Sequence, residues 1–208
     1  MEFQLQSISQ WLDELASDKP APGGGAAAAL CCALSAALVS MVARFTVQKK
    51  KYESMRQQAE ALLAASETLR ARAQNLMQED AAAFAKVAEA YSISKSDDAR
   101  HGAIQNALMY ATEIPLAIAE TACECAELAL QIAAFGNKTV LADAGSAAIF
   151  AKSAADSALL NVYENIRNIE NREDALTFQE RAAQVTQRLQ TLAYMPFMNT
   201  SKENEIAK

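Results

Sequence analysis

Apolar residues in this chain recur at helical spacing, in about six stretches, and show no strand-type alternation. A short stretch, residues 7–16, has a single apolar face that carries Ile8, Trp11, Leu12 and Leu15. The next stretch, residues 25–47, is apolar on most sides, and Arg44 is its only charged residue. A helix of this kind belongs in the middle of a bundle or at a subunit contact.

The third stretch, residues 52–91, contains no glycine or proline. Its apolar seam advances in alternating steps of four and three residues, as in a heptad pattern, through Leu62, Ser66, Leu69, Ala73, Leu76, Asp80, Ala83 and Val87. A carboxylate on such a seam is costly unless it is paired, hydrogen-bonded or protonated. Asp80 is therefore either a buried structural polar residue or a group with a perturbed pKa, suited to acid–base chemistry in an interhelical pocket.

A fourth helix is predicted from Asp97, a suitable N-cap, to about Phe135, where Gly136 and Asn137 provide a C-cap. Pro115 lies inside this stretch. Proline lacks a backbone N–H group and clashes with the preceding turn, so we expect a kink or break near Thr112.

The fifth predicted helix, residues 140–167, is rich in alanine and becomes polar at both ends, with Asp143 near its start and Asn161 and Asn165 near its finish. Asparagine disfavours a helix interior, so the two amides are expected to hydrogen-bond either across helices or to a ligand. A last amphipathic helix is predicted over residues 173–194.

Between the first two helices lies the sequence Pro20-Ala-Pro-Gly-Gly-Gly25, followed directly by an alanine-rich run. The prolines fix the backbone, the glycines release it, and the alanines start a helix abruptly. The segment is either a tight connection between helices or a helix N-terminus whose bare N–H groups hold an anionic or polar ligand group.

Three consecutive lysines, residues 49–51, close the second helix. They either interact with the negative end of the helix dipole and with water, or Lys50 and Lys51 bind a carboxylate of a ligand.

Composition supports one all-α domain over residues 1–199, followed by a disordered tail over residues 200–208. The chain has 208 residues, 51% of them hydrophobic, with only 6 glycines and 4 prolines. The net charge of −6 argues against nucleic acid or an anionic membrane surface as a partner. No apolar run without a charge is expected to reach membrane-spanning length.

The four cysteines, Cys31, Cys32, Cys123 and Cys125, lack metal-ligand spacing, and His101 is the only histidine. A zinc site and a histidine-based triad are therefore not expected, and the cysteines are predicted to be small buried apolar residues. The N-terminal residues lack the apolar core of a signal peptide, and a cytoplasmic location is expected.

Taken in order, several motifs resemble the cyclodeaminase/cyclohydrolase family of tetrahydrofolate enzymes. The resemblance covers nearly the whole chain and rests on Pro20–Gly25, Ser40–Ala43, Lys49–Tyr52, Asp80–Phe84, Ile114–Leu116, Gly136-Asn137, Ala142–Gly145 and Asn161 to Asn165. The family forms the C-terminal half of formiminotransferase-cyclodeaminase and also occurs as a free-standing bacterial protein. The resemblance implies an all-α homodimer, formed through helices, that acts on a one-carbon unit carried by tetrahydrofolate and needs no metal.

Three functions follow as hypotheses. The leading one is cyclisation of 5-formimino-tetrahydrofolate to 5,10-methenyl-tetrahydrofolate with release of ammonia. The second is hydrolysis of the methenyl form to 10-formyl-tetrahydrofolate. The third, of another class, is a non-catalytic folate-binding or purely structural helical protein.

The resemblance also implies roles for individual residues. Asp80 matches the catalytic aspartate. The folate pocket would be lined by Pro22, Gly23, Gly24, Gly25, Asp143, Asn161 and Asn165, and Lys50 and Lys51 would meet the glutamate tail. The chain departs from the family at Ala26 and Ala142, where serines are common and supply hydroxyl groups.

Overall fold

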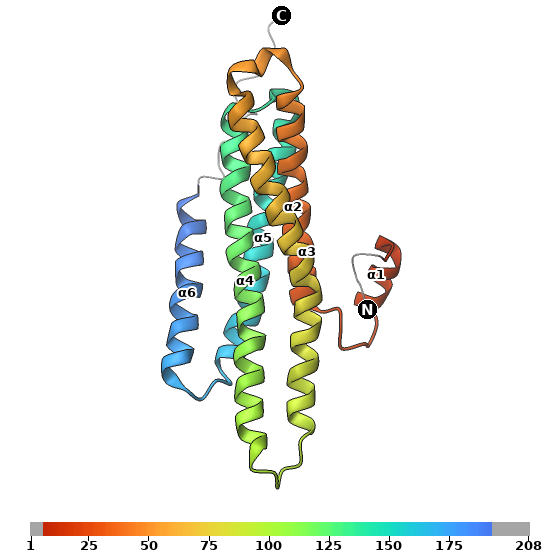
Figure 1. Cartoon of the computed structure of the whole chain (residues 1–208), viewed down its shortest axis with the longest axis vertical. Helices are drawn as coiled ribbons and strands as arrows, with labels where there is room; N and C mark the ends of the chain where they lie inside the picture. The colour runs from red at the N-terminus through yellow and green to blue at the C-terminus, as the bar shows by residue number, and fades with distance from the viewer. Residues whose placement is uncertain (1–5, 193–208) are drawn as a thin grey trace, which may run out of the picture.

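A computed structural model describes residues 6–192 of the protein and contains only helical elements within that range. Four long antiparallel helices form a bundle (Figure 1): α2 (Gly24–Val47), α3 (Arg56–Ser92), α4 (Ala99–Phe135) and α5 (Leu141–Ile166). The short helix α1 (Ile8–Leu15) precedes the bundle, and α6 (Arg172–Thr191) packs along the outside of α4. Short 3₁₀ segments, η2 (Lys50–Met55) and η3 (Lys138–Val140), join α2 to α3 and α4 to α5. The predicted all-α class is confirmed.

The predicted helices are present, with shifts at some ends. The third begins at Arg56 rather than near Tyr52, because the intervening residues form the η2 segment. Asp97 Oδ1 accepts the N–H of Ala99 at 2.9 Å, which caps a helix that starts at Ala99. The predicted end of the last helix and the predicted tail over residues 200–208 lie outside the described residues.

Of the kink or break predicted near Thr112, the break does not occur. Helix α4 continues through this residue from Ala99 to Phe135. A neighbouring helix supplies the hydrogen bond that proline cannot make, as described below.

Alanine fills the space between the central helices. The five aligned alanines of α5 are fully buried, as are four on α2; they are Ala144, Ala147, Ala151, Ala154 and Ala158, and Ala26, Ala29, Ala36 and Ala43. Such small side chains let helix axes approach closely. One result is a direct bond from Ser35 Oγ to the carbonyl oxygen of Ala147, at 2.8 Å.

The cysteines are all free thiols, and three of them are buried as predicted. Cys32 and Cys125 face one another across the core with their sulfur atoms 3.8 Å apart. Cys31 is half-buried, and its thiol donates to the carbonyl of Phe150.

Helix α2 is the one helix of the described range that is long and apolar enough, by length and composition, to span a membrane. The prediction that no uncharged run reaches that length is wrong, because residues 20–43 carry no charge. In this structure α2 packs against α3, α4 and α5, and 61% of its most apolar window is buried. A core helix of a soluble bundle has the same properties.

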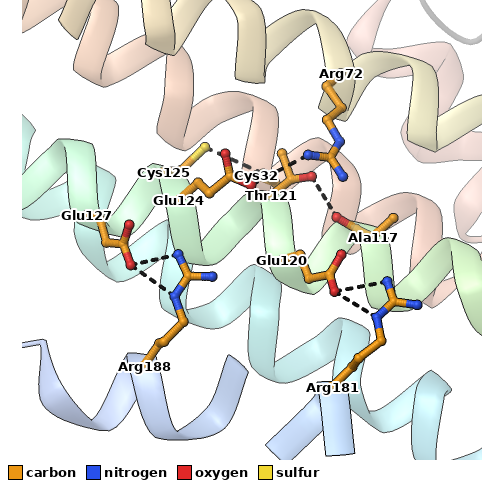
Figure 2. A network of polar contacts seen from close by, with 10 residues as sticks. All are labelled: Cys32, Arg72, Ala117, Glu120, Thr121, Glu124, Cys125, Glu127, Arg181 and Arg188. Carbon is orange, nitrogen blue, oxygen red and sulfur yellow. Dashed lines mark hydrogen bonds and ion pairs between the residues drawn. The ribbon is translucent and has the colours of Figure 1, made fainter. Parts of the chain in front are cut away.

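Ion pairs join α6 to α4 (Figure 2). Arg181 forms a two-pronged contact with Glu113, at 2.7 and 2.9 Å, and also reaches Glu120 at 3.0 Å. Two turns further along both helices, Arg188 contacts Glu127 at 2.8 Å. Planar guanidinium groups suit this geometry, which fixes the register of α6 on α4.

Candidate active site

A cavity of about 330 Å³ lies at the end of the bundle where α2 begins and α5 finishes. Its volume falls at the lower end of the range typical of small-molecule sites. Four helices and the segment before α2 contribute to its wall, through Pro20, Ala21, Gly23, Gly24, Gly25, Asp80, Ala81, Ala83, Phe84, Val87, Leu108, Ala111, Pro115, Asn161 and Asn165. Helices α3 and α4 extend past the start of α2 at this end (Figure 1).

Asp80 caps the first turn of α2. Its Oδ2 accepts the backbone N–H of Ala26 at 2.9 Å. This amide has no acceptor within the helix, because the first intrahelical bond runs from Ala27 N to Gly23 O, at 3.0 Å. The N-cap residue, Gly23, has no side chain to serve instead. The carboxylate on the α3 seam is therefore bonded to backbone rather than paired with a charged side chain.

Burial raises the pKa of the Asp80 carboxyl above its ordinary value. The hydrogen bond from Ala26 opposes this effect and is the smaller of the two. Asp80 forms no ion pair within residues 6–192. A carboxyl group that is partly buried, without an ion-pair partner and held at one oxygen can both accept and return a proton nearer to neutral pH than an exposed aspartate can.

Of the three glycines at the start of α2, only one occupies a position where a side chain would not fit. A Cβ atom on Gly25 would lie 2.0 Å from Asp80 Oδ1 and 2.6 Å from its Cγ. At Gly24 the nearest atom would be Asn161 Nδ2 at 3.8 Å, and at Gly23 nothing lies within 4 Å. Gly25 thus lets the carboxylate reach the start of α2, so the segment is both a close contact between helices and part of a cavity wall.

The same helix start leaves donors free for a ligand. Within the described part of the chain, the amides of Gly24 and Gly25 donate to no protein acceptor. They lie beside Asp80 at the positive end of the α2 dipole. A ligand atom with a lone pair or a partial negative charge would be favoured there.

The two predicted asparagines both line the cavity but are held differently. Asn165 Nδ2 donates across to α4, to the carbonyl oxygen of Ala111 at 2.7 Å. Asn161 Nδ2 makes a longer bond of 3.3 Å to Ser157 O, within its own helix. No described residue donates to the Oδ1 atom of either side chain.

Three predicted binding residues lie far from this cavity. Asp143 is near the start of α5, 18 residues before Asn161, which corresponds to about 27 Å along a helix. Lys50 and Lys51 follow the far end of α2, whose 24 residues span about 36 Å. These residues therefore do not line this cavity, because long straight helices separate their two ends, and their binding roles stay predictions from the sequence.

Pro22 lies between two lining residues, Ala21 and Gly23, and its own side chain is not part of the wall.

Ala26, where serine is common in the family, contributes to the site through its backbone. Its side chain is fully buried, and its contribution to the site is the backbone N–H, which every residue except proline supplies.

Sequence reasoning missed the apolar wall of the cavity, chiefly Phe84, Leu108 and Pro115. Phe84 lies one helical turn after Asp80 and is 51% exposed, which the spacing alone could have indicated. The part played by Pro115 could not be inferred, because it depends on a residue 50 positions later in the chain.

Within residues 6–192 no group of three potential metal-ligating side chains occurs.

Comparison with known proteins places this chain in a family. The chain is 42% identical over 171 residues to methenyltetrahydrofolate cyclohydrolase from Methylorubrum extorquens, covering 80% of this chain and 82% of that protein. It is 29% identical over 167 residues to formimidoyltransferase-cyclodeaminase from Mus musculus, covering 78% of this chain and 31% of that protein.

The crystal structure of formiminotetrahydrofolate cyclodeaminase from Thermotoga maritima matches with a TM-score of 0.86 and 29% sequence identity. The match covers 93% of this chain and 94% of the other. The model of the formiminotransferase-cyclodeaminase family matches residues 7–184. This chain therefore belongs to the formiminotransferase-cyclodeaminase family.

Proposed function

We propose that this protein is a folate-dependent one-carbon enzyme in which Asp80 transfers the protons. The observation that carries the proposal is the Asp80 carboxyl itself, which is partly buried, bonded to Ala26 N at 2.9 Å, and has a raised pKa. It lies in a cavity of about 330 Å³, room for a pterin ring with its one-carbon unit while the remainder of a folate extends outside. Family membership supports the same substrate class.

The leading reaction is cyclisation of 5-formimino-tetrahydrofolate. N10 attacks the carbon of the protonated formimino group, N5–CH=NH₂⁺, to give a tetrahedral carbon bonded to N5, the protonated N10 and an amino group; the positive charge ends on the methenyl product. The ionised Asp80 takes the proton from N10 and then delivers it to the amino nitrogen, so that the C–N bond breaks and ammonia leaves. One proton moves from N10 to the leaving group, and the carboxylate is regenerated.

The second candidate is hydrolysis of methenyl-tetrahydrofolate, and the 42% identity to a methenyltetrahydrofolate cyclohydrolase favours it. Here Asp80 takes a proton from water as the oxygen attacks the methenyl carbon. The C–N5 bond then breaks, N5 gains a proton, and the hydroxyl group loses its own to give the 10-formyl product. One proton is released overall, and the same carboxyl serves both steps.

An absorbance assay with two substrates tests the proposal. The purified protein is incubated separately with 5-formimino-tetrahydrofolate and with methenyl-tetrahydrofolate. A rise in methenyl absorbance with the first substrate supports the cyclodeaminase, and a fall with the second, faster than without protein, supports the cyclohydrolase. A protein that binds tetrahydrofolate but changes neither substrate would contradict the enzymatic proposal.

We further propose that the protein is a homodimer formed through helices, and that neither nucleic acid nor a membrane is its partner. Large apolar side chains that remain exposed on α2 and α5 support the dimer; they are Leu34, Phe45, Ile149, Phe150 and Leu160. Leu160 is the most exposed of these, at 72%. Sedimentation equilibrium should return twice the chain mass, and a monomer at micromolar concentration would contradict it. The cytoplasmic location remains a prediction from the sequence.

A further inference from the structure

The α4 wall of the cavity contains a carbonyl group that its own helix cannot satisfy. In an α-helix the carbonyl oxygen of Ala111 would accept the N–H of residue 115. That residue is Pro115, which has no N–H group. Both Ala111 and Pro115 line the cavity.

Asn165 supplies the missing donor from α5. Its Nδ2 lies 2.7 Å from Ala111 O, a short bond compared with the 3.3 Å bond of Asn161 within its own helix. The pairing also settles which end of the amide is which, because only the NH₂ group can donate to a carbonyl. The oxygen, Oδ1, is then left as an acceptor with no protein donor among the described residues.

We propose that Pro115 and Asn165 form a positioning pair. Pro115 removes a helical donor so that Ala111 O fixes the Asn165 amide, and Asn165 Oδ1 then accepts a hydrogen bond from an N–H group of the ligand. This inference rests on the proposed function for the identity of the ligand. Reduced pterins present N–H groups along one edge of the ring, whereas a carbonyl at the same place would be repelled by Oδ1.

The pairing makes a prediction about stability that does not involve a ligand. N165A leaves Ala111 O without a donor in the cavity wall and should lower the melting temperature by several degrees. In the double variant N165A/P115A, residue 115 regains its N–H and bonds Ala111 O within α4, so most of the loss should be recovered. N168A, which removes an exposed asparagine just beyond the end of α5, serves as the control and should change little.

Ligand binding separates positioning of the ligand from structural support alone. With 5-formyl-tetrahydrofolate as a stable probe, N165A and N165A/P115A should both bind at least about tenfold more weakly than the wild type, the cost of one lost hydrogen bond to a buried group. Wild-type affinity in the double variant would limit Asn165 to structural support and overturn the proposed contact with ligand. Failure of P115A to restore the melting temperature would overturn the pairing itself.

The two arms also distinguish this inference from the proposed function. If the wild-type protein binds no folate, the assignment of substrate fails, whereas the melting-temperature cycle still tests the Pro115–Asn165 pairing. If the wild type binds the probe and N165A binds it equally well, the positioning role fails while the folate assignment stands.

Discussion

At the scale of single residues, the site depends on one carboxyl group and the space made for it. Asp80 sits on an apolar seam because it caps α2 through Ala26 N, and it reaches that amide because Gly25 has no side chain. The sequence alone identified Asp80 as anomalous, since a charge at a heptad core position is rare. It could not identify the bonding partner, because Ala26 lies 54 residues earlier in the chain.

The raised pKa of Asp80 predicts how stability depends on pH. The folded state binds the Asp80 proton more tightly than the unfolded chain does. The protonated carboxyl therefore contributes fully to the free energy of unfolding below the ordinary aspartate pKa of about 3.9, and this contribution is lost as pH rises through the higher folded pKa. D80N has no such titration and can still accept the Ala26 N–H through its amide oxygen. The melting temperature of D80N, minus that of the wild type, should therefore increase as pH rises from about 4 towards neutral. A difference that stays constant with pH would contradict the raised pKa.

The same pKa predicts the activity profile. Asp80 acts first as a base, so kcat/KM should fall as pH drops through its raised pKa, above the range of an ordinary aspartate. Initial rates between pH values of about 4 and 8 check this. A fall in kcat/KM centred on the ordinary aspartate pKa would mean that burial does not raise the pKa of Asp80.

Gly25 offers a steric test. In G25A the new Cβ would overlap Asp80 Oδ1, so the carboxyl must rotate away from Ala26 N, and turnover should fall about 100-fold with the helices intact. G102A is the matched control, because nothing lies within 4 Å of a Cβ at that position in α4. It should keep full activity and stabilise the fold by about 0.5–1 kcal/mol. Equal activities of the two variants would show that the close approach at Gly25 is unimportant.

At the scale of elements, the period of the apolar residues predicted every long helix, because each one buries a stripe wide enough to recognise. The ends were less certain, since the η2 segment depends on local geometry that the period does not record. Pro115 was predicted to kink or break α4; the break does not occur, and Asn165 satisfies the carbonyl that proline leaves free. Helix propensity acts locally, whereas this compensation comes from another helix.

Helix α6 is attached to α4 both by buried apolar residues and by ion pairs. R181A removes contacts to both Glu113 and Glu120 (Figure 2 shows the latter) and should destabilise the protein by about 1 kcal/mol, since the group is partly exposed. Hydrogen exchange within Arg172–Thr191 should accelerate while that of the bundle helices does not. R167A, whose partner Glu164 lies in the same helix, is the control. Unchanged exchange in α6 would mean that its apolar contacts suffice.

At the scale of the whole molecule, the cavity exists because α2 starts and α5 stops partway along two longer helices. Residues far apart in the sequence meet there, and the motifs predicted Asp80, the three glycines and the two asparagines of the wall but not its apolar part. Lys50, Lys51 and Asp143 do not line the cavity, since they lie at the other end of the bundle, and their predicted binding roles stay predictions. Nothing in a residue pattern specifies which end of a 24-residue helix faces a ligand.

The central claim is that Asp80 transfers protons on a folate one-carbon unit, and D80N tests it most directly. Turnover of 5-formimino-tetrahydrofolate and of methenyl-tetrahydrofolate is measured for wild type and variant, together with affinity for 5-formyl-tetrahydrofolate. We expect the variant to fold, to bind the probe within a few-fold of the wild type, and to lose turnover by about 100-fold or more. Turnover by D80N at the wild-type rate would contradict it.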